Sequence, residues 1–163
     1  MQAFVSASAI ALTLIASAAS AQAVRTEKNM SLELANQIAA ATVASCSASG
    51  YNVTAAVVDR AGNLRALQRA DNAGPHTVGA AQGKAYTSAS ARNATTAMLE
   101  NVQKNPGAAT LVDIPGFLIL GGGVPVKVGN EVIGAVGVGG APGGHLDEQC
   151  ANAGIAKVAE LLK

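Results

Sequence analysis

The sequence predicts a single α/β domain of the α+β type, in which helices cover an antiparallel sheet of about five strands. Three observations support this class. Segments with apolar residues at helical spacing occur at the start, middle and end of the chain, and short runs rich in Val, Ile and Leu lie between them. Short loops containing glycine separate neighbouring runs, and strands joined by hairpins pair antiparallel. The length of 163 residues suits one domain.

The chain begins with an uncharged apolar segment. Residues 1–23 contain no Asp, Glu, Lys or Arg and end in Ala21-Gln22-Ala23, which is typical of a secretory signal peptide and its cleavage site. No basic residue precedes the apolar run, and the alternative is an uncleaved membrane anchor, although the run falls short of the roughly 20 strongly apolar residues of a span. We expect a signal peptide over residues 1–23, a mature domain over residues 24–163, a periplasmic or secreted location, and no membrane span after cleavage.

The first folded element is expected to be a helix that begins after Ser31. Serine is a good N-cap, and Leu34, Ile38 and Ala41 then recur on one face. Gly50 ends the helix, because glycine tolerates the left-handed conformation after a helix.

A hairpin follows this helix. Residues 51–59 are rich in β-branched side chains and predict a strand. Residues 64–69 predict the returning strand, and the sequence Arg-Ala-Gly-Asn between the two forms the turn.

The middle of the chain predicts one long helix with a stripe of small residues. Thr77 is its candidate N-cap, and Pro106 breaks the pattern near residue 105. Small side chains let a helix lie flat on a sheet. The stripe consists of Val78, Ala81, Ala85 and Ser88.

Three short strands and a helix complete the prediction. The strands are residues 117–120, 124–128 and 131–138, and Gly129-Asn130 between the last two is a hairpin signal. Glycines within the last strand mark a close approach either of another backbone or of a flat ligand. Asp147 is the candidate cap of the final helix.

Cys46 and Cys150 are the two cysteines of the chain. In an exported protein such a pair predicts one disulfide, which here would join the first helix to the last. The alternative is two separate buried thiols.

The charges and motifs exclude several function classes. A net charge of +1 argues against a nucleic-acid surface, which needs clustered Lys and Arg. The cysteines and histidines lack the spacing of a zinc site, and no Ser lies in a Gly-x-Ser-x-Gly motif. A binding role is therefore favoured over an enzymatic one, and no catalytic residue is predicted.

Glycine-rich loops near the end of the chain are candidate anion-binding elements. No Lys follows these glycines, as it would in a P-loop. The loops also lie near the end of the chain, whereas a dinucleotide-binding fingerprint belongs to an early strand–turn–helix unit. A glycine loop that enters a helix still presents free amides to a carboxylate, and the alternative is a tight strand-to-helix turn. The candidate residues are Gly139, Gly140, Gly143 and Gly144.

Two histidines and one lysine are the other candidates. His76 lies where a helix begins, and because the macrodipole there disfavours imidazolium, a neutral ring could ligate a metal or haem iron. His145 follows the glycine loop and could bond a ligand carboxylate or a metal. Lys84 could attract a carboxylate. The alternatives are that His76 is a solvated loop residue, that His145 is an exposed residue at a helix entrance, and that Lys84 is a surface lysine.

The order and spacing of several short segments resemble the GlcG/HbpS haem-binding family, which includes the C-terminal domain of PduO-type proteins. The resemblance covers roughly residues 30–160. It is carried by Asp59 with Gly62, Asp71, the segment Lys84-Ala85-Tyr86-Thr87, the run Gly121-Gly122-Gly123, and the closing Asp147-Glu148, Cys150-Ala151 and Gly154.

The resemblance implies an antiparallel sheet covered by helices, assembly into homo-oligomers, and binding of haem. Exported members are linked to haem, iron or redox sensing, which implies a periplasmic sensor protein as partner. On this basis His76 is the expected iron ligand, and Lys84 or the amides of residues 139–144 would hold the propionates. The rival interpretation is an enzyme or accessory factor of hydroxy- or keto-acid catabolism that needs no metal. A third is a periplasmic subunit that binds only a protein partner.

Overall fold

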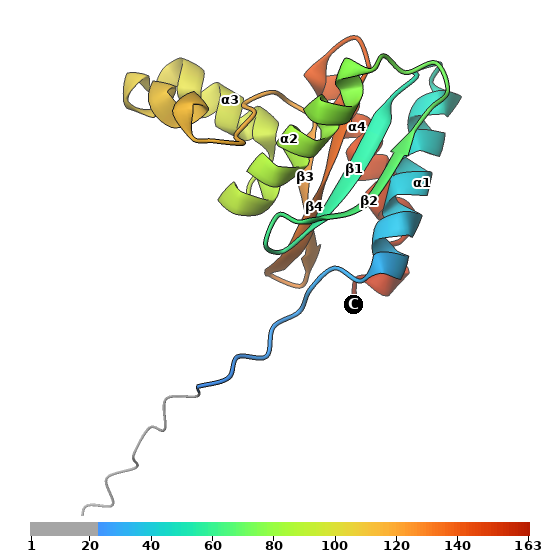
Figure 1. Ribbon diagram of the computed structural model, residues 1–163, viewed down its shortest axis with the longest axis horizontal. Coiled ribbons are helices and arrows are strands. Elements are labelled where there is room, and N and C mark those ends of the chain that lie inside the picture. The colour runs from blue at the N-terminus through green and yellow to red at the C-terminus, as the bar shows by residue number, and fades with distance from the viewer. Residues whose placement is uncertain (1–22) are drawn as a thin grey trace, which may run out of the picture.

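Four strands form one antiparallel sheet in the computed structural model, which describes residues 23–163 (Figure 1). The strand order is β2-β1-β4-β3, so β1 and β4 lie at the centre. The bounds are Thr54–Asp59 for β1, Leu64–Arg69 for β2, Gly123–Val128 for β3 and Glu131–Gly139 for β4. The predicted α+β class and antiparallel pairing are confirmed, with four strands in place of about five. The predicted signal peptide lies outside the described residues, except for Ala23.

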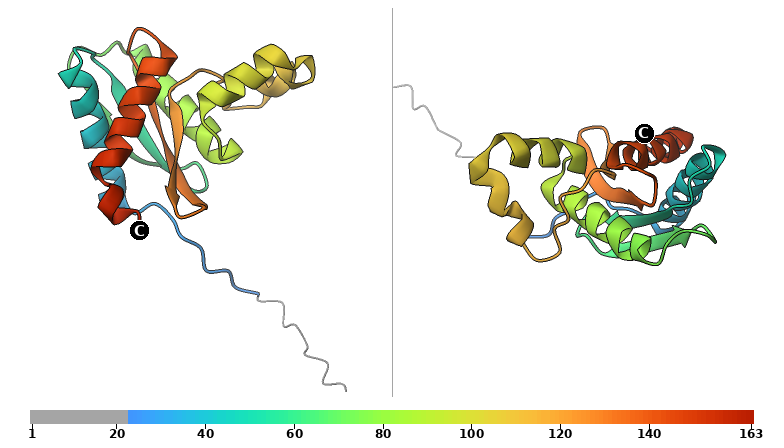
Figure 2. Two further views of the ribbon diagram at one scale, coloured as in Figure 1. Left: turned by 180° about the vertical axis from the view of Figure 1, so that it is seen from behind. Right: turned by 90° about the horizontal axis from the view of Figure 1, so that it is seen from above.

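Helices cover both faces of the sheet. In Figure 2, α2 (His76–Ala91) lies on one face, and α1 (Leu32–Ala48) and α4 (Gly144–Lys157) lie side by side on the other. The main core fills the space between the sheet and the α1–α4 pair, with Ile38 and Val136 among its fully buried members. A short 3₁₀ helix, η2 (Ala159–Leu161), follows α4. Within residues 23–163, no helix has the length and apolar character to cross a membrane.

The predicted start and end of α1 are confirmed. The hydroxyl of Ser31 accepts a hydrogen bond of 3.1 Å from the amide of Leu34, as an N-cap does. Gly50 follows the helix with a φ of +80°, in the left-handed region that glycine tolerates.

The expected strand at residues 117–120 does not form. The amide of Leu118 donates to the hydroxyl of Thr87 in α2 at 2.7 Å, so this backbone group bonds a helix side chain and not a strand. Leu118 also lies against Gly83 of α2. The apolar run therefore docks on a helix, which explains its hydrophobicity without a fifth strand.

The long helix expected over residues 77–105 is two helices. Thr77 is not the cap, because its buried hydroxyl bonds the carbonyl of Gly74 at 2.6 Å and lies 2.7 Å from the hydroxyl of Thr54. α2 begins one residue earlier and ends at Ala91, where Arg92 adopts a left-handed φ of 54°.

A second helix, α3 (Thr95–Lys104), and the 3₁₀ helix η1 (Pro106–Asp113) form an arm that projects from the sheet (Figure 1). The buried hydroxyl of Thr95 accepts a hydrogen bond of 2.8 Å from the amide of Gly123, which fixes the start of α3 beside β3. This contact between distant segments explains why the helical pattern is interrupted.

The glycines of β4 allow the backbone of α2 to lie close to the sheet. A side chain at Gly137 would overlap the carbonyl oxygen of Ala81, and a Cβ at Gly139 would lie 3.2 Å from the Cβ of Ala80. Of the two predicted roles for these glycines, close approach of another backbone is the one found at both positions.

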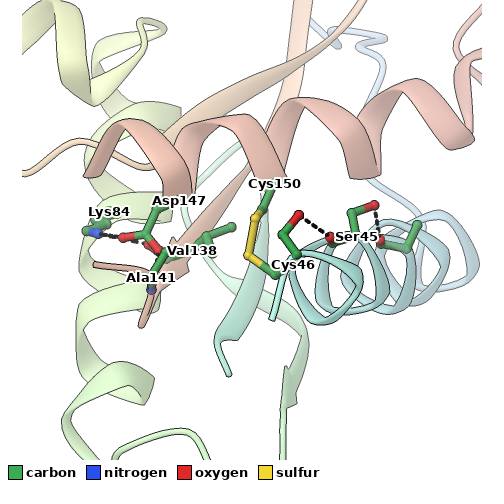
Figure 3. Close-up of a disulfide and its surroundings, with 9 residues drawn as sticks. Ser45, Cys46, Lys84, Val138, Ala141, Asp147 and Cys150 are labelled. Atoms are coloured by element: carbon green, nitrogen blue, oxygen red, sulfur yellow. Dashed lines mark hydrogen bonds and ion pairs between the residues drawn. A yellow bond between two sulfur atoms is a disulfide. The ribbon is translucent and has the colours of Figure 1, made fainter. Parts of the chain in front are cut away.

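A disulfide joins α1 to α4. Cys46 and Cys150 are bonded, with their Cα atoms 5.3 Å apart, and the predicted pairing is confirmed (Figure 3). Nearby, a Cβ at Gly154 of α4 would overlap the hydroxyl of Thr42 in α1, so the two helices are in close contact. The bond therefore fixes the layer that covers one face of the sheet.

Candidate functional site

A buried ion pair connects the two faces of the sheet. Nζ of Lys84, from α2, donates to Oδ2 of Asp147 at 2.7 Å and to the carbonyl of Val138 at 2.9 Å (Figure 3). Both residues are buried, at 4% and 3% exposure. Oδ1 of Asp147 accepts a hydrogen bond of 3.0 Å from the amide of Ala141. Lys84 is therefore not a surface lysine.

The pairing also changes the role expected for Asp147. α4 begins at Gly144 with Gly143 as its N-cap, so Asp147 lies inside the first turn and is not the cap. The partners are far apart in the chain, and neither lies in a motif that would reveal the contact. The sequence pattern indicates each residue separately and does not reveal the pair.

Burial dominates the electrostatics of this pair. Loss of hydration raises the pKa of Asp147 above its ordinary value, and the hydrogen bond and charge of Lys84 oppose this rise only in part. Charged residues are rarely this buried unless they are paired, which fits the contact observed here. The positive charge of Lys84 is therefore largely paired within the protein, with the side chain of Asp147.

A cavity of about 340 Å³ lies beside the ion pair, and we call it the α4 cavity. It brings together three predicted site residues, Lys84, Gly144 and His145. The leucines of the cavity give it an apolar wall. Its complete lining is Lys84, Thr96, Leu99, Leu120, Gly121, Gly144 and His145.

The start of α4 gives the α4 cavity hydrogen-bond donors. Gly143 makes no side-chain cap bond, and its carbonyl accepts hydrogen bonds from the amides of Leu146 and Asp147 at 2.9 and 3.1 Å. The first amides, those of Gly144 and His145, have no carbonyl partner within the helix. These amides and the helix dipole favour an anion. Gly139 is buried against α2, and a side chain at Gly140 would contact the carbonyl of Asn52, so these two predicted residues are not part of the lining.

A second concavity of about 330 Å³ lies between α2 and the β1–β2 hairpin, and we call it the α2 groove. Gly79, Gly83 and Tyr86 line it at helical spacing, and Gly62 and Gly116 lie against the ring of Tyr86. Its complete lining is Val58, Gly62, Leu64, Gly79, Gln82, Gly83, Tyr86 and Gly116. No pattern in the sequence indicates that these residues form a site.

The two histidines lie at the starts of two different helices. His76 is the first residue of α2 and its ring lies against Gly74, while the ring of His145 lies against Gly143 near the start of α4. Both are exposed. His76 does not line the α2 groove, but it precedes Gly79 by one turn, and this spacing places it toward the same side of α2; His145 lines the α4 cavity. The structure thus separates His76 from Lys84 and His145.

Among the described residues, no three His, Cys, Asp or Glu side chains gather as a metal-ligating group.

The sequence of residues 30–156 matches the model of a protein family described as haem degrading protein HbpS-like. The chain belongs to the HbpS-like family. Protein GlcG of Escherichia coli (strain K12) is 38% identical over 114 residues, which cover 70% of this chain and 84% of GlcG.

Solved structures show the same fold as this HbpS-like chain. A double mutant of HbpS from Streptomyces reticuli has a TM-score of 0.79 at 36% identity, covering 94% of this chain and 98% of that one. A PduOC complex with haem has a TM-score of 0.70 at 23% identity, covering 78% of this chain and 94% of that one, which is a likeness of fold.

Proposed function

We propose that this HbpS-like protein binds a haem-like tetrapyrrole along the α2 groove, with His76 as the iron ligand. The observation that carries the proposal is the alignment of His76, Gly79, Gly83 and Tyr86 on one side of α2. From His76 to Tyr86 this strip is about 15 Å long at 1.5 Å per residue. Membership of the HbpS-like family supports the choice of haem.

The residues of the groove fit a flat apolar ligand. Gly79 has open space around its Cβ position, where a larger side chain would obstruct a planar ring, and Tyr86 offers an aromatic surface; Gly83 lines the groove beside Leu118. His76 is the first residue of α2, and the lone pair of a neutral imidazole can bind iron. Bound haem would supply iron for redox or ligand-binding chemistry.

The α4 cavity is the alternative location for the same ligand. There His145 would be the imidazole, and the amides at the start of α4 would hold a propionate. Because Asp147 already pairs with Lys84, we assign the amides the larger part in binding the anion.

Haemin titration followed by the Soret absorbance tests the proposal and its location. We expect a saturable Soret shift that His76→Ala alters and His145→Ala leaves unchanged. Gly79 has open space around its Cβ position, so Gly79→Leu should fold yet obstruct the groove, while Gly79→Ala, its matched control, should still bind. The absence of any Soret shift would reject haem binding, and an effect of His145→Ala alone would move the site to the α4 cavity.

The proposal extends to an exported homo-oligomer that works in haem, iron or redox sensing with a periplasmic sensor protein. The uncharged residues 1–23 support export. N-terminal sequencing of the protein isolated from its own periplasm should begin at Val24, and analytical ultracentrifugation should give a mass above that of one chain. A cytoplasmic protein that starts at Met1, or a monomer, would contradict these points.

The second candidate function is a metal-free enzyme or accessory factor that acts on a hydroxy- or keto-acid in the α4 cavity. Lys84, His145 and the first amides of α4 meet there beside Leu99 and Leu120, which suits a small carboxylate. Thermal stabilisation by lactate or pyruvate that His145→Ala weakens and His76→Ala does not would favour this function. Stabilisation by haemin and not by these acids would exclude it.

A further inference from the structure

We infer that a third cavity, at the end of the sheet where β1 and β3 finish, binds a small oxyanion with two or more negative charges. This cavity has a volume of about 550 Å³, and we call it the basic cavity. Neither the α2 groove nor the α4 cavity shares a residue with it. Its polar side chains are Lys28, Arg60, Arg92, Lys127, Asn130 and Glu131.

The cations of the basic cavity come from four separate parts of the chain. Lys28 belongs to the segment before α1, and Arg60 follows β1. Arg92 caps the C-terminal end of α2, and Lys127 lies in β3 next to the hairpin turn. The tertiary structure brings these charges together around one concavity. They form a basic cluster there, although the net charge of the whole chain is only +1.

Most of the cations that line the basic cavity form no ion pair with a carboxylate of the described residues. Arg60 is paired, at 2.7 Å with Glu131 and at 3.2 Å with Glu27. Among residues 23–163, no carboxylate forms an ion pair with Lys28, Arg92 or Lys127. Like charges that share a cavity repel one another, and an anion bound between them would relieve that repulsion.

The backbone at Arg92 is a second and independent observation. Arg92 is the one residue other than glycine with a positive φ within residues 23–163. Helices that end in this conformation usually place glycine or asparagine there, because a longer side chain is strained. An arginine therefore occupies a position where its backbone conformation is unfavourable, and Arg92 lines the basic cavity.

The chemistry of the lining defines the ligand class. A guanidinium presents donors in a planar fork that matches carboxylate and phosphate oxygens, and the lysines add point charges. Three unpaired cations exceed the charge of a monocarboxylate, so a phosphate or a di- or tricarboxylate is the better match. The volume limits the ligand to a small molecule.

Titration of the purified protein at low ionic strength tests this inference. The probes are inorganic phosphate, pyrophosphate and citrate, with acetate as the monovalent control, and binding is followed by calorimetry and by amide NMR shifts. We expect saturable binding of at least one multivalent probe, with shifts that centre on residues 127–131, and no comparable binding of acetate. Preference for pyrophosphate over citrate, or the reverse, distinguishes phosphate from carboxylate recognition.

Two double variants separate a local site from a general charge effect. Arg92→Asn with Lys127→Gln removes two cations, and asparagine suits the left-handed backbone, so this variant should fold and bind at least tenfold more weakly. Arg65→Gln with Lys157→Gln removes two exposed cations outside the basic cavity and should keep its affinity within twofold. No saturable binding to the unmodified protein, or an equal loss in both variants, would overturn the inference. The readouts involve neither haem nor His76, so this result is independent of the proposed function.

Discussion

Lys84 and Asp147 meet across the sheet, with Nζ and Oδ2 2.7 Å apart and both side chains almost fully buried. The pair ties α2 on one face to α4 on the other, and the carbonyl of Val138 in β4 accepts a further hydrogen bond from Lys84. Lys84 also lines the α4 cavity. The energetics of the pair are therefore relevant both to the fold and to the second candidate function.

Removing one partner of this pair should be costly. In Lys84→Met the carboxylate of Asp147 stays buried without its cation, and we expect a loss of about 3–5 kcal/mol in the free energy of unfolding. The double variant Lys84→Met with Asp147→Leu should lose much less, because neither charge is left alone. Urea denaturation measures both. Equal losses in the single and double variants would show that packing, and not the unpaired charge, sets the cost.

The pair also predicts a pH dependence. Because burial raises the pKa of Asp147 above the ordinary 3.8, the folded protein binds this proton more tightly than the unfolded chain. The stability that this group contributes is thus present below 3.8 and is lost as the pH rises through the folded pKa. Relative to Asp147→Asn, which does not titrate, the unmodified protein should gain stability as the pH falls from neutral through that pKa. Denaturation across pH measures the difference, and a carboxyl NMR midpoint below 3.8 would contradict it.

The disulfide should contribute a large part of the stability. Cys46 and Cys150 are 104 residues apart, and closing so long a loop restricts the unfolded chain, so Cys46→Ala with Cys150→Ala should cost about 2–5 kcal/mol. Chemical denaturation with and without dithiothreitol measures this. The reductant should destabilise the unmodified protein and leave the double variant unchanged.

Substitution of two glycines by alanine should change the stability of the protein in opposite directions. Gly137→Ala would force a methyl group into the carbonyl of Ala81, and we expect a loss of roughly 1–3 kcal/mol or more. Gly79→Ala lies within α2 with open space around the new Cβ, so it should gain about 0.5–1 kcal/mol from helix propensity. Thermal unfolding measures both. A destabilised Gly79→Ala would mean that the α2 backbone itself requires glycine there.

Patterns between near neighbours in the chain predicted much of the fold. The Ser31 cap, the stop at Gly50 and both hairpins depend on contacts within a few residues, and these predictions are confirmed. The expected strand at residues 117–120 was wrong, because an apolar run does not reveal whether it will dock on a strand or on a helix.

The candidate site was predicted only in parts. The sequence pattern predicted Lys84, Gly144 and His145, which the structure brings together, and His76, which lies elsewhere. It missed the α2 groove, since glycines in a helix carry no signal of a concave surface. It also missed the basic cavity, whose cations are scattered along the chain.

The sequence by itself determined the α+β class and the family, because periodicity, caps, turns and ordered motifs lie within short segments. It favoured a bond between the two cysteines but left two separate thiols open, and the structure decided for the bond. Only the tertiary structure decided that α2 ends at Arg92, that Lys84 is buried against Asp147, and which side chains share a cavity. These features depend on how distant segments pack and on the loss of water between them. No local pattern in the sequence encodes that packing, so only the folded structure shows it.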